Sequence, residues 1–246
     1  MFKSRTVCAI VPALDEAKAI GGVVAGLRAL RNDIGQPLID RVIVADNGST
    51  DGTGTLAQLA GASVVVEPRR GYGNACMAGI AAASEAEILL FVDGDNSVIP
   101  QETLSLLAAL DLGADLAIGA RTHAEAGAMT LPQRFGNGLA CSLARLIWNV
   151  PMSDLGPFRA VRKTAFDSLD MQDMTYGWTI EMQLKAFQRG QRVVEVPVSV
   201  RCRLGHSKIS GTVSGVIGAG VGIFSMIAKL WWQGRSRATG HRVGRV

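Results

Sequence analysis

Two carboxylates separated by a single glycine, Asp93 and Asp95, follow the apolar run Ile88–Val92. A short apolar run predicts a buried strand, so the two acids would stand where that strand leaves its sheet. Hard divalent cations prefer oxygen ligands and are often shared with substrate phosphates. The spacing therefore indicates a Mg²⁺ or Mn²⁺ site that would neutralise a diphosphate leaving group. An Asp-Gly turn after a strand is the structural alternative.

A basic, glycine-containing turn with the sequence Arg-Arg-Gly-Tyr-Gly-Asn spans residues 69–74 and opens a predicted helix. Backbone N–H groups at a helix start favour phosphate, so Arg70 and Gly71 are candidate donor-binding residues. The two glycines faintly imitate a dinucleotide fingerprint. However, Cys76 occupies the third glycine position, and Asp93 already belongs to the acid pair.

Three further charged residues are candidates for chemistry. Arg121 follows a predicted strand and Arg134 starts a predicted helix; arginines so placed suit bidentate contact with phosphate, although surface ion pairs are the alternative. Glu181 lies on the first turn of another predicted helix. It could act as a general base, bind a substrate hydroxyl or interact with the helix dipole.

Strand and helix patterns alternate through the first half of the chain. Predicted strands are Val7–Val11, Val42–Ala45, Val64–Val66, Ile88–Val92 and Leu116–Ile118, and predicted helices are Ile20–Leu30, Thr50–Leu59, Gly71–Ala83 and Glu102–Leu110. Short apolar strands separated by helices predict an α/β fold whose parallel sheet is covered on both faces. Ligands of such sheets bind beyond the carboxyl ends of the strands. Asp15-Glu16, Asp46-Asn47 and the acid pair all fall there.

The second half is less regular. We expect helices at Pro132–Trp148 and Trp178–Arg189, and strands at Phe158–Val161 and Arg192–Val196, the latter stopped by Pro197. Residues 1–211 are expected to form one catalytic domain, and residues 212–246 an apolar helix and a basic tail. Thr212–Ala228 is uncharged, and Lys229, Trp231 and Trp232 follow it. This order allows an interfacial membrane helix, a buried helix or a short membrane span.

Charge and cysteine usage narrow the partners and the compartment. Beyond Glu195 the chain has eight basic residues and no acidic one, although its overall net charge is only +4. Such an end suits phosphate, nucleic acid or anionic lipid, or is a solubilising tail. The acidic body and an aromatic content of only 5% argue against nucleic acid. Scattered cysteines and the absence of a signal-peptide pattern predict a cytoplasmic chain. The uncharged stretch and the basic end predict a peripheral position on the inner face of the cell membrane.

Several motifs together resemble a known family. Val-Pro-Ala-Leu-Asp-Glu at 11–16, Val-Ala-Asp-Asn-Gly-Ser-Thr-Asp-Gly-Thr at 44–53 and Asp93-Gly94-Asp95 resemble family 2 glycosyltransferases of the GT-A fold. Asp-Leu-Gly-Pro-Phe-Arg at 154–159, Tyr176-Gly177-Trp178, Glu181-Met182 and Ser-Lys-Ile-Ser-Gly-Thr at 207–212 are similar to its dolichyl-phosphate mannose synthase-like branch. The first motif has Asp15 where Asn is common, and Asn47 replaces a usual second Asp.

The resemblance implies a role for each matching position. The donor nucleotide's base and ribose would be held by Pro12, Leu14, Glu16 and Asp46, and the metal and donor diphosphate by Asp93, Gly94 and Asp95. Phosphates of donor or acceptor would contact Arg121 and Arg134. A loop carrying Arg203, Ser207 and Lys208 would meet a lipid-phosphate acceptor.

These expectations describe a metal-dependent, inverting glycosyltransferase. A nucleotide-diphospho-sugar, GDP-mannose or a UDP-hexose, would donate its hexose to a polyprenyl phosphate. A phosphate acceptor is already ionised and needs no strong base, so Glu181 could position a substrate instead. The alternatives are a transferase that acts on a soluble hydroxyl or glycan acceptor, and a non-enzymatic module that binds anionic lipid.

Overall fold

The computed structural model of the protein describes residues 2–205 and 213–240. It confirms the expected α/β architecture, with one seven-stranded sheet in the order β3-β2-β1-β4-β6-β5-β7. The strands are β1 (Val7–Ala13), β2 (Arg41–Asp46), β3 (Ser63–Val66), β4 (Ile88–Phe91), β5 (Leu116–Ala124), β6 (Arg159–Arg162) and β7 (Val193–Val200). All run parallel except β6, which is antiparallel to both of its neighbours, β4 and β5.

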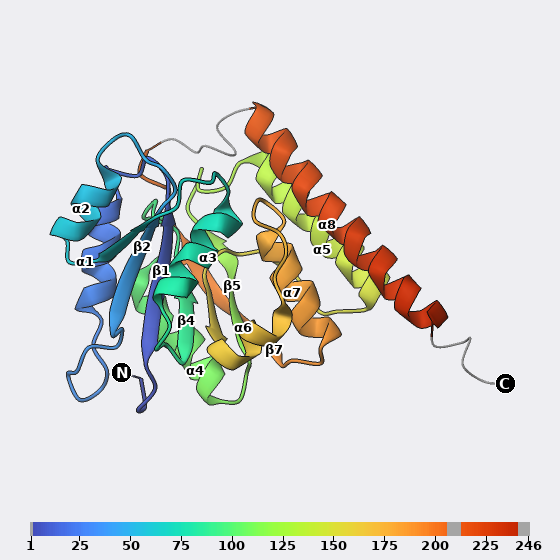
Figure 1. The fold of residues 1–246 in the computed structure, drawn as a ribbon, viewed down its shortest axis with the longest axis horizontal. Coiled ribbons are helices and arrows are strands. Elements are labelled where there is room, and N and C mark those ends of the chain that lie inside the picture. The colour runs from blue at the N-terminus through green and yellow to red at the C-terminus, as the bar shows by residue number, and fades with distance from the viewer. Residues whose placement is uncertain (1, 206–212, 241–246) are drawn as a thin grey trace.

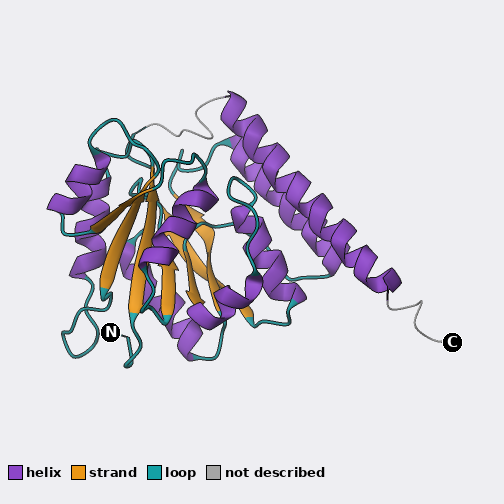
Figure 2. Ribbon diagram, viewed as in Figure 1, coloured by secondary structure: helices purple, strands orange, loops and turns teal. Residues whose placement is uncertain are grey.

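Helices cover both faces of this sheet (Figures 1 and 2). They are α1 (Ile20–Ala29), α2 (Thr53–Leu59), α3 (Tyr72–Ala82), α4 (Thr103–Asp111), α5 (Leu131–Trp148), α6 (Lys163–Leu169), α7 (Trp178–Gln188) and α8 (Val213–Gly240), with a 3₁₀ turn at Pro100–Glu102. The short helix α6 was not predicted from the sequence.

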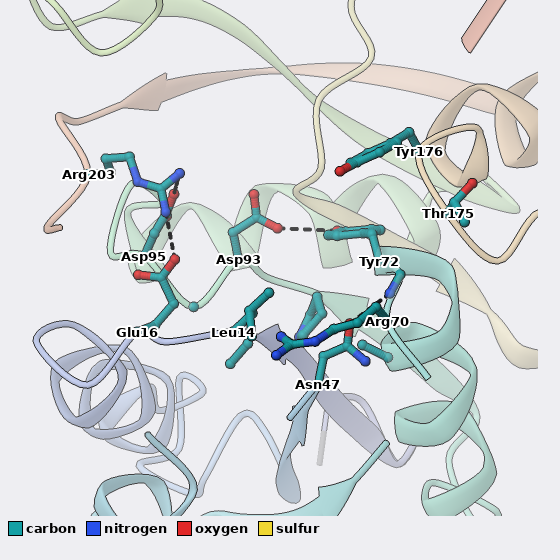
Figure 3. A pocket seen from close by; sticks show the side chains of 15 residues that line it. Leu14, Glu16, Asn47, Arg70, Tyr72, Asp93, Asp95, Thr175, Tyr176 and Arg203 are labelled. Carbon is teal, nitrogen blue, oxygen red and sulfur yellow. Dashed lines mark hydrogen bonds and ion pairs between the residues drawn. The ribbon is translucent and has the colours of Figure 1, made fainter. Parts of the chain in front are cut away.

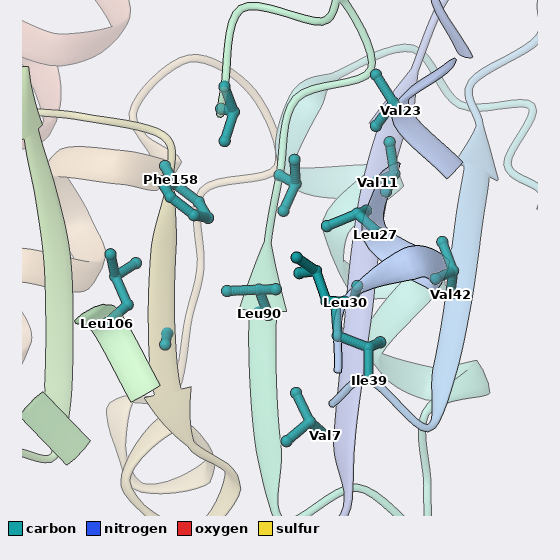
Figure 4. Close-up of a cluster of buried hydrophobic side chains, with 14 of the residues drawn as sticks. Val7, Val11, Val23, Leu27, Leu30, Ile39, Val42, Leu90, Leu106 and Phe158 are labelled. Atoms are coloured by element: carbon teal, nitrogen blue, oxygen red, sulfur yellow. The ribbon is translucent and has the colours of Figure 1, made fainter. Parts of the chain in front are cut away.

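Consecutive residues of the central strands point to opposite faces, and both faces are buried. Leu90 packs in a first core cluster with Leu27 of α1 and Leu106 of α4 (Figure 4). Phe91 packs in a second cluster with Phe166 of α6 and Trp178 of α7, with ring centroids 6.0–6.4 Å apart. Burial on both faces explains why these strands are continuous apolar runs in the sequence.

A third cluster joins α5, α7 and α8 at one end of the molecule, where α5 and α8 lie side by side (Figure 1). It contains Ala144 of α5, Leu184 of α7 and Met226 of α8, all buried. Among the described helices, none combines the length and hydropathy required to cross a membrane. The expected domain boundary after residue 211 lies outside the described residues.

Strand order changes direction between β1 and β4, since β2 lies on one side of β1 and β4 on the other. Crevices at such switch points are where α/β sheets bind ligands. The strand expected to stop at Pro197 instead continues to Val200. That prediction was wrong because β7 is an edge strand, where a proline nitrogen need not donate to a neighbour.

Candidate active site

A cavity of about 580 Å³ opens at the switch point, beyond the carboxyl ends of β1 and β4 (Figure 3). Its lining combines apolar and glycine positions with convergent charged groups. The lining residues are Pro12, Ala13, Leu14, Glu16, Asn47, Arg70, Gly71, Tyr72, Ala75, Asp93, Gly94, Asp95, Thr175, Tyr176 and Arg203. The predicted donor residues, Asp46 excepted, therefore meet in one place.

The acid pair lies at the floor of this cavity, directly after β4. Asp95 is 8% exposed, and its Oδ1 accepts hydrogen bonds from the Ser97 N–H at 3.0 Å and hydroxyl at 2.6 Å. Asp93 Oδ1 accepts the Tyr72 hydroxyl at 3.2 Å. Burial, and then the charge of Asp95, raise the pKa of Asp93 to about 7, although Tyr72, Arg203 and Arg121 oppose the shift.

This pair has the donor chemistry of a divalent-cation site. Two neighbouring buried carboxylates resist being ionised together, because their negative charges repel each other. A bound cation would offset this repulsion. No cluster of three or more metal-binding side chains occurs in the described part of the chain. A site with only two carboxylates matches cations that keep water and substrate phosphate among their ligands. Asp93 and Asp95 would thus hold the metal jointly with a diphosphate.

Arg203 lies over the acid pair, although the sequence placed it on an acceptor loop. Its Nη2 donates to Glu16 Oε1 at 2.6 Å, and its Nη1 lies 3.4 Å from Asp95 Oδ2 (Figure 3). The residue after it, Leu204, donates its N–H to the Asp95 carbonyl at 2.9 Å. Arg203 thus lines the same cavity as the predicted donor residues, and its expected contact with the acceptor stays a prediction.

Two loops are tied together to present Leu14 and Glu16. The N–H groups of Glu16 and Ala17 donate to Thr53 Oγ1 at 2.8 Å and Asp51 Oδ2 at 3.0 Å. Asp15 has a left-handed backbone with φ of 49°, which Asp and Asn tolerate better than most residues, and so can serve where Asn is common.

Asp46 does not line the cavity, and its expected role in donor binding stays a prediction. Its Oδ1 accepts the Ser49 N–H at 2.8 Å, and a Cβ added at Gly54 would lie 2.9 Å from its Oδ2. Both carboxylate oxygens are therefore directed at the turn that leads into α2. Asp46 thus holds the turn, and the next residue, Asn47, forms part of the cavity wall.

Asn47 is that wall residue, and its side-chain amide organises the basic turn. Its Nδ2 donates to the carbonyls of Glu67 at 2.9 Å and Arg69 at 2.7 Å, while its Oδ1 accepts the Gly71 N–H at 2.9 Å. Gly71 has φ of 141°, and a Cβ there would lie 2.3 Å from the Met174 carbonyl. This position therefore requires glycine.

Glu181 does not line the cavity, and its expected contact with substrate stays a prediction. The side chain is 1% exposed. Its carboxylate accepts the backbone N–H groups of Gln172 and Asp173 at 2.7–3.1 Å and pairs with Lys185 Nζ at 2.7 Å. Glu181 thus positions the loop that carries Thr175 and Tyr176 into the cavity.

Arg121 and Arg134 line a second, smaller cavity of about 410 Å³. Its lining is Ala120, Arg121, Thr122, Ala124, Met129, Arg134, Asn137, Ser153 and Asp154. Arg121 donates from Nε and Nη2 to Asp154 at 2.9 and 2.6 Å. Although burial works to raise it, the hydrogen bonds and charge of Arg121 hold the pKa of Asp154 below its usual value.

The two cavities lie within electrostatic reach of one another, since the charge of Arg121 lowers the pKa of Asp93. The expected acceptor residues Ser207 and Lys208 lie outside the described residues. Four lining residues have no role predicted from the sequence: Asn47, Tyr72, Thr175 and Tyr176. Tyr72 belongs to the basic turn, and Tyr176 to the Tyr-Gly-Trp motif that resembles the family.

The parallel sheet, its switch-point cavity and the Asp-Gly-Asp pair define a GT-A glycosyltransferase. The sequence model of the family described as "Glycosyl transferase family 2" matches residues 8–169, so the chain belongs to that family.

Its relatives differ in what they act on. An uncharacterised glycosyltransferase of Mycobacterium tuberculosis is 36% identical over 212 residues, which cover 86% of this chain and 93% of the relative. A polyprenol monophosphomannose synthase of Mycolicibacterium smegmatis is 34% identical over 191 residues, covering 70% of this chain and 71% of the relative. Glucosyl-3-phosphoglycerate synthase of M. tuberculosis, solved with Mn²⁺, UDP and phosphoglyceric acid, shares the fold with a TM-score of 0.75. It is 23% identical, with 93% of this chain and 79% of that chain covered.

Proposed function

We propose that the protein transfers a hexose from a nucleotide-diphospho-sugar to the phosphate of a polyprenyl phosphate at a membrane surface. The observation that carries this proposal is the pairing of two cavities. The larger contains the acid pair Asp93 and Asp95, and the smaller contains Arg121 and Arg134. One provides groups for a donor diphosphate, and the other provides cationic groups for a second anion.

The larger cavity would bind the donor. Leu14 and Asn47 would flank the nucleoside, Arg70 and the Gly71 N–H would approach the phosphates, and Asp93 and Asp95 would hold Mg²⁺ or Mn²⁺. The cation, when bound, stabilises the negative charge that develops on the departing diphosphate. Arg203, already beside Asp95, adds a second positive charge to the same oxygens.

The smaller cavity would bind the acceptor phosphate. Asp154 fixes the guanidinium plane of Arg121 through two hydrogen bonds, and Arg134 provides a second cation from the first turn of α5. An ionised phosphate oxygen attacks the anomeric carbon as the bond from that carbon to the diphosphate breaks. Attack opposite the leaving group inverts the anomeric centre. No proton has to be removed, which agrees with a buried Glu181 whose carboxylate already has three partners, the N–H groups of Gln172 and Asp173 and the Lys185 ammonium.

A soluble phosphorylated acceptor is the second candidate. The smaller cavity is lined mainly by polar groups and would hold a small phosphorylated acid as well as a lipid headgroup. The relative with a bound phosphoglyceric acid shares the fold.

Competition between acceptors separates the two candidates. With Mn²⁺ and a panel of GDP- and UDP-hexoses, we expect sugar transfer to a short-chain isoprenyl phosphate and little transfer to 3-phosphoglycerate. Transfer only to the soluble acid would refute the lipid-acceptor proposal and leave the enzyme class intact. Failure to transfer to either phosphate, with donor bound, would refute both.

A further inference from the structure

An apolar stripe runs along the outer side of α5. Leu131, Phe135, Leu139 and Leu146 are 81%, 73%, 39% and 81% exposed. At 100° per residue these four positions fall within an arc of about 80°. The buried residues of α5, such as Ala144, lie on the opposite side of the helix in the third core cluster. A helix with one buried face normally turns polar residues to solvent, whereas this arc of α5 exposes four large apolar side chains.

The neighbouring helix α8 has the same character. Val221 and Trp232 are 63% and 70% exposed. Both lie on the side of α8 opposite Met226 and Leu230, which pack in the third cluster. α5 and α8 pack side by side at the end of the molecule (Figure 1). Two adjacent helices thus turn large apolar side chains away from the core that they share.

The charged residues of α5 and α8 have one sign. No acidic residue occurs between Glu125 and Asp154, a stretch that includes all of α5, nor anywhere beyond Glu195. The exposed basic residues Arg134, Arg145 and Lys229 belong to these helices. Apolar side chains flanked by cations and free of acids are the composition of helices that lie in the interface of an anionic bilayer.

A second copy of the chain fits the same surface poorly. A two-fold dimer places the same patch on both sides of the contact. The arginines and lysine of α5 and α8 would then face their own counterparts, and neither helix offers an acid to pair with them. An anionic bilayer satisfies both the charge and the apolar area.

We propose that the outer faces of α5 and α8, with Leu131 and Phe135 as anchors, seat the protein on an anionic lipid bilayer. Membrane binding by these helices does not depend on the proposed function. Only the identity of the lipid substrate that would reach the protein there rests on it. Arg134 lies between the two anchors in the sequence and lines the smaller cavity. A lipid phosphate held there would be bound at the level where the helices meet the membrane.

Vesicle binding of the full chain tests this proposal. The double variant Leu131→Ser, Phe135→Ser removes two anchors that lie outside both cavities. Its matched control is Leu59→Ser, Leu112→Ser, at positions 80% and 75% exposed on other helices or their ends. With phosphatidylglycerol and phosphatidylcholine vesicles, we expect the stripe variant to lose at least about tenfold in partitioning, because apolar burial is lost. The control should stay within about twofold.

Two further measurements test the proposal: the salt dependence of vesicle binding and the oligomeric state of the protein. Wild-type binding should weaken at high salt without vanishing, since screening affects charges and not apolar burial. Equal binding by both double variants would overturn the proposal, as would a wild-type dimer that the stripe variant dissociates without change in vesicle binding. Transfer to a short-chain isoprenyl phosphate in solution should be unchanged in the stripe variant. Wild-type chain that makes this transfer yet ignores vesicles would overturn the docking surface alone; vesicle binding without transfer would overturn the proposed function alone.

Discussion

Arg203 Nη2 donates to Glu16 Oε1 at 2.6 Å and so ties the segment after β7 to the loop after β1. The same guanidinium reaches Asp95, at 3.4 Å. One side chain therefore links two segments that line the larger cavity and places a positive charge beside a predicted metal ligand.

Arg203→Lys should weaken donor binding about tenfold or more, because a lysine cannot contact two groups with a planar fork. The measurement is donor affinity by calorimetry with Mn²⁺ present. Arg201→Lys is the matched control, since Arg201 bonds to Asn96 and Val98 and does not line the cavity. Equal loss in both variants would mean that the segment responds only as a structural unit.

Metal binding should depend on pH through Asp93, whose pKa is raised to about 7 in the metal-free protein. An acid with a raised pKa in the folded state stabilises the fold at low pH, and this contribution is lost as the pH rises through 7. A cation binds the ionised form, so stabilisation by Mn²⁺ should grow between pH 6 and 8. Thermal unfolding with and without Mn²⁺ measures this. Asp93→Asn should abolish the pH dependence; if it persists there, another group titrates.

Glu181 and Lys185 form a buried pair, with side chains 1% and 10% exposed, and removing one partner should be costly. Glu181→Ala should destabilise the protein by about 3–5 kcal/mol, because Lys185 would remain buried and charged. The double variant Glu181→Gln, Lys185→Met keeps an acceptor for the loop and removes both charges. We expect it to recover most of the stability and of kcat. A double variant that folds but has no turnover would instead indicate that Glu181 acts as a catalytic base.

The sequence predicts the sheet, its switch-point edge and most of the donor cavity because these depend on local patterns. Apolar runs of four to seven residues mark strands buried on both faces, and polar clusters directly after them lie at one edge. Asp93 and Asp95 could be placed at this edge from those two patterns alone. Arg203 could not be placed this way, since its contact with Glu16 spans 187 residues of chain.

Two predicted site residues, one at the end of β2 and one on α7, do not line the larger cavity. Asp46 and Glu181 stand at positions typical of ligand contact, yet their oxygens accept backbone N–H groups, of Ser49 and of Asp173. A carboxylate accepts hydrogen bonds equally well from backbone N–H groups and from a ligand, so residue type alone does not distinguish the two roles. The exposed stripe of α5 was missed for a related reason, because only the packing shows which side of an apolar helix is free.

Asn47 gives a test of this loop chemistry. Asn47→Asp restores the residue type that the family motif commonly has, but it would direct a carboxylate oxygen at the carbonyls of Glu67 and Arg69. We expect a loss of about 1–3 kcal/mol in the free energy of unfolding and weaker donor binding. Asn137→Asp is the control for stability, because within the described residues Asn137 forms side-chain hydrogen bonds through its acceptor oxygen Oδ1. Unchanged stability in Asn47→Asp would mean that the turn is held by other contacts.

The proposal that the larger cavity binds the donor and the smaller one the acceptor is tested most directly by two variants, Arg134→Ala and Asp95→Ala. Donor affinity and the KM for the acceptor are measured for each. Arg134 lies only in the smaller cavity and Asp95 only in the larger. Arg134→Ala should raise the KM for isoprenyl phosphate about tenfold, the value of one charge-assisted contact, and leave donor affinity with Mn²⁺ unchanged. Asp95→Ala should abolish metal-dependent donor binding. Loss of donor affinity in Arg134→Ala, or an unchanged acceptor KM, would contradict the assignment of the smaller cavity to the acceptor phosphate.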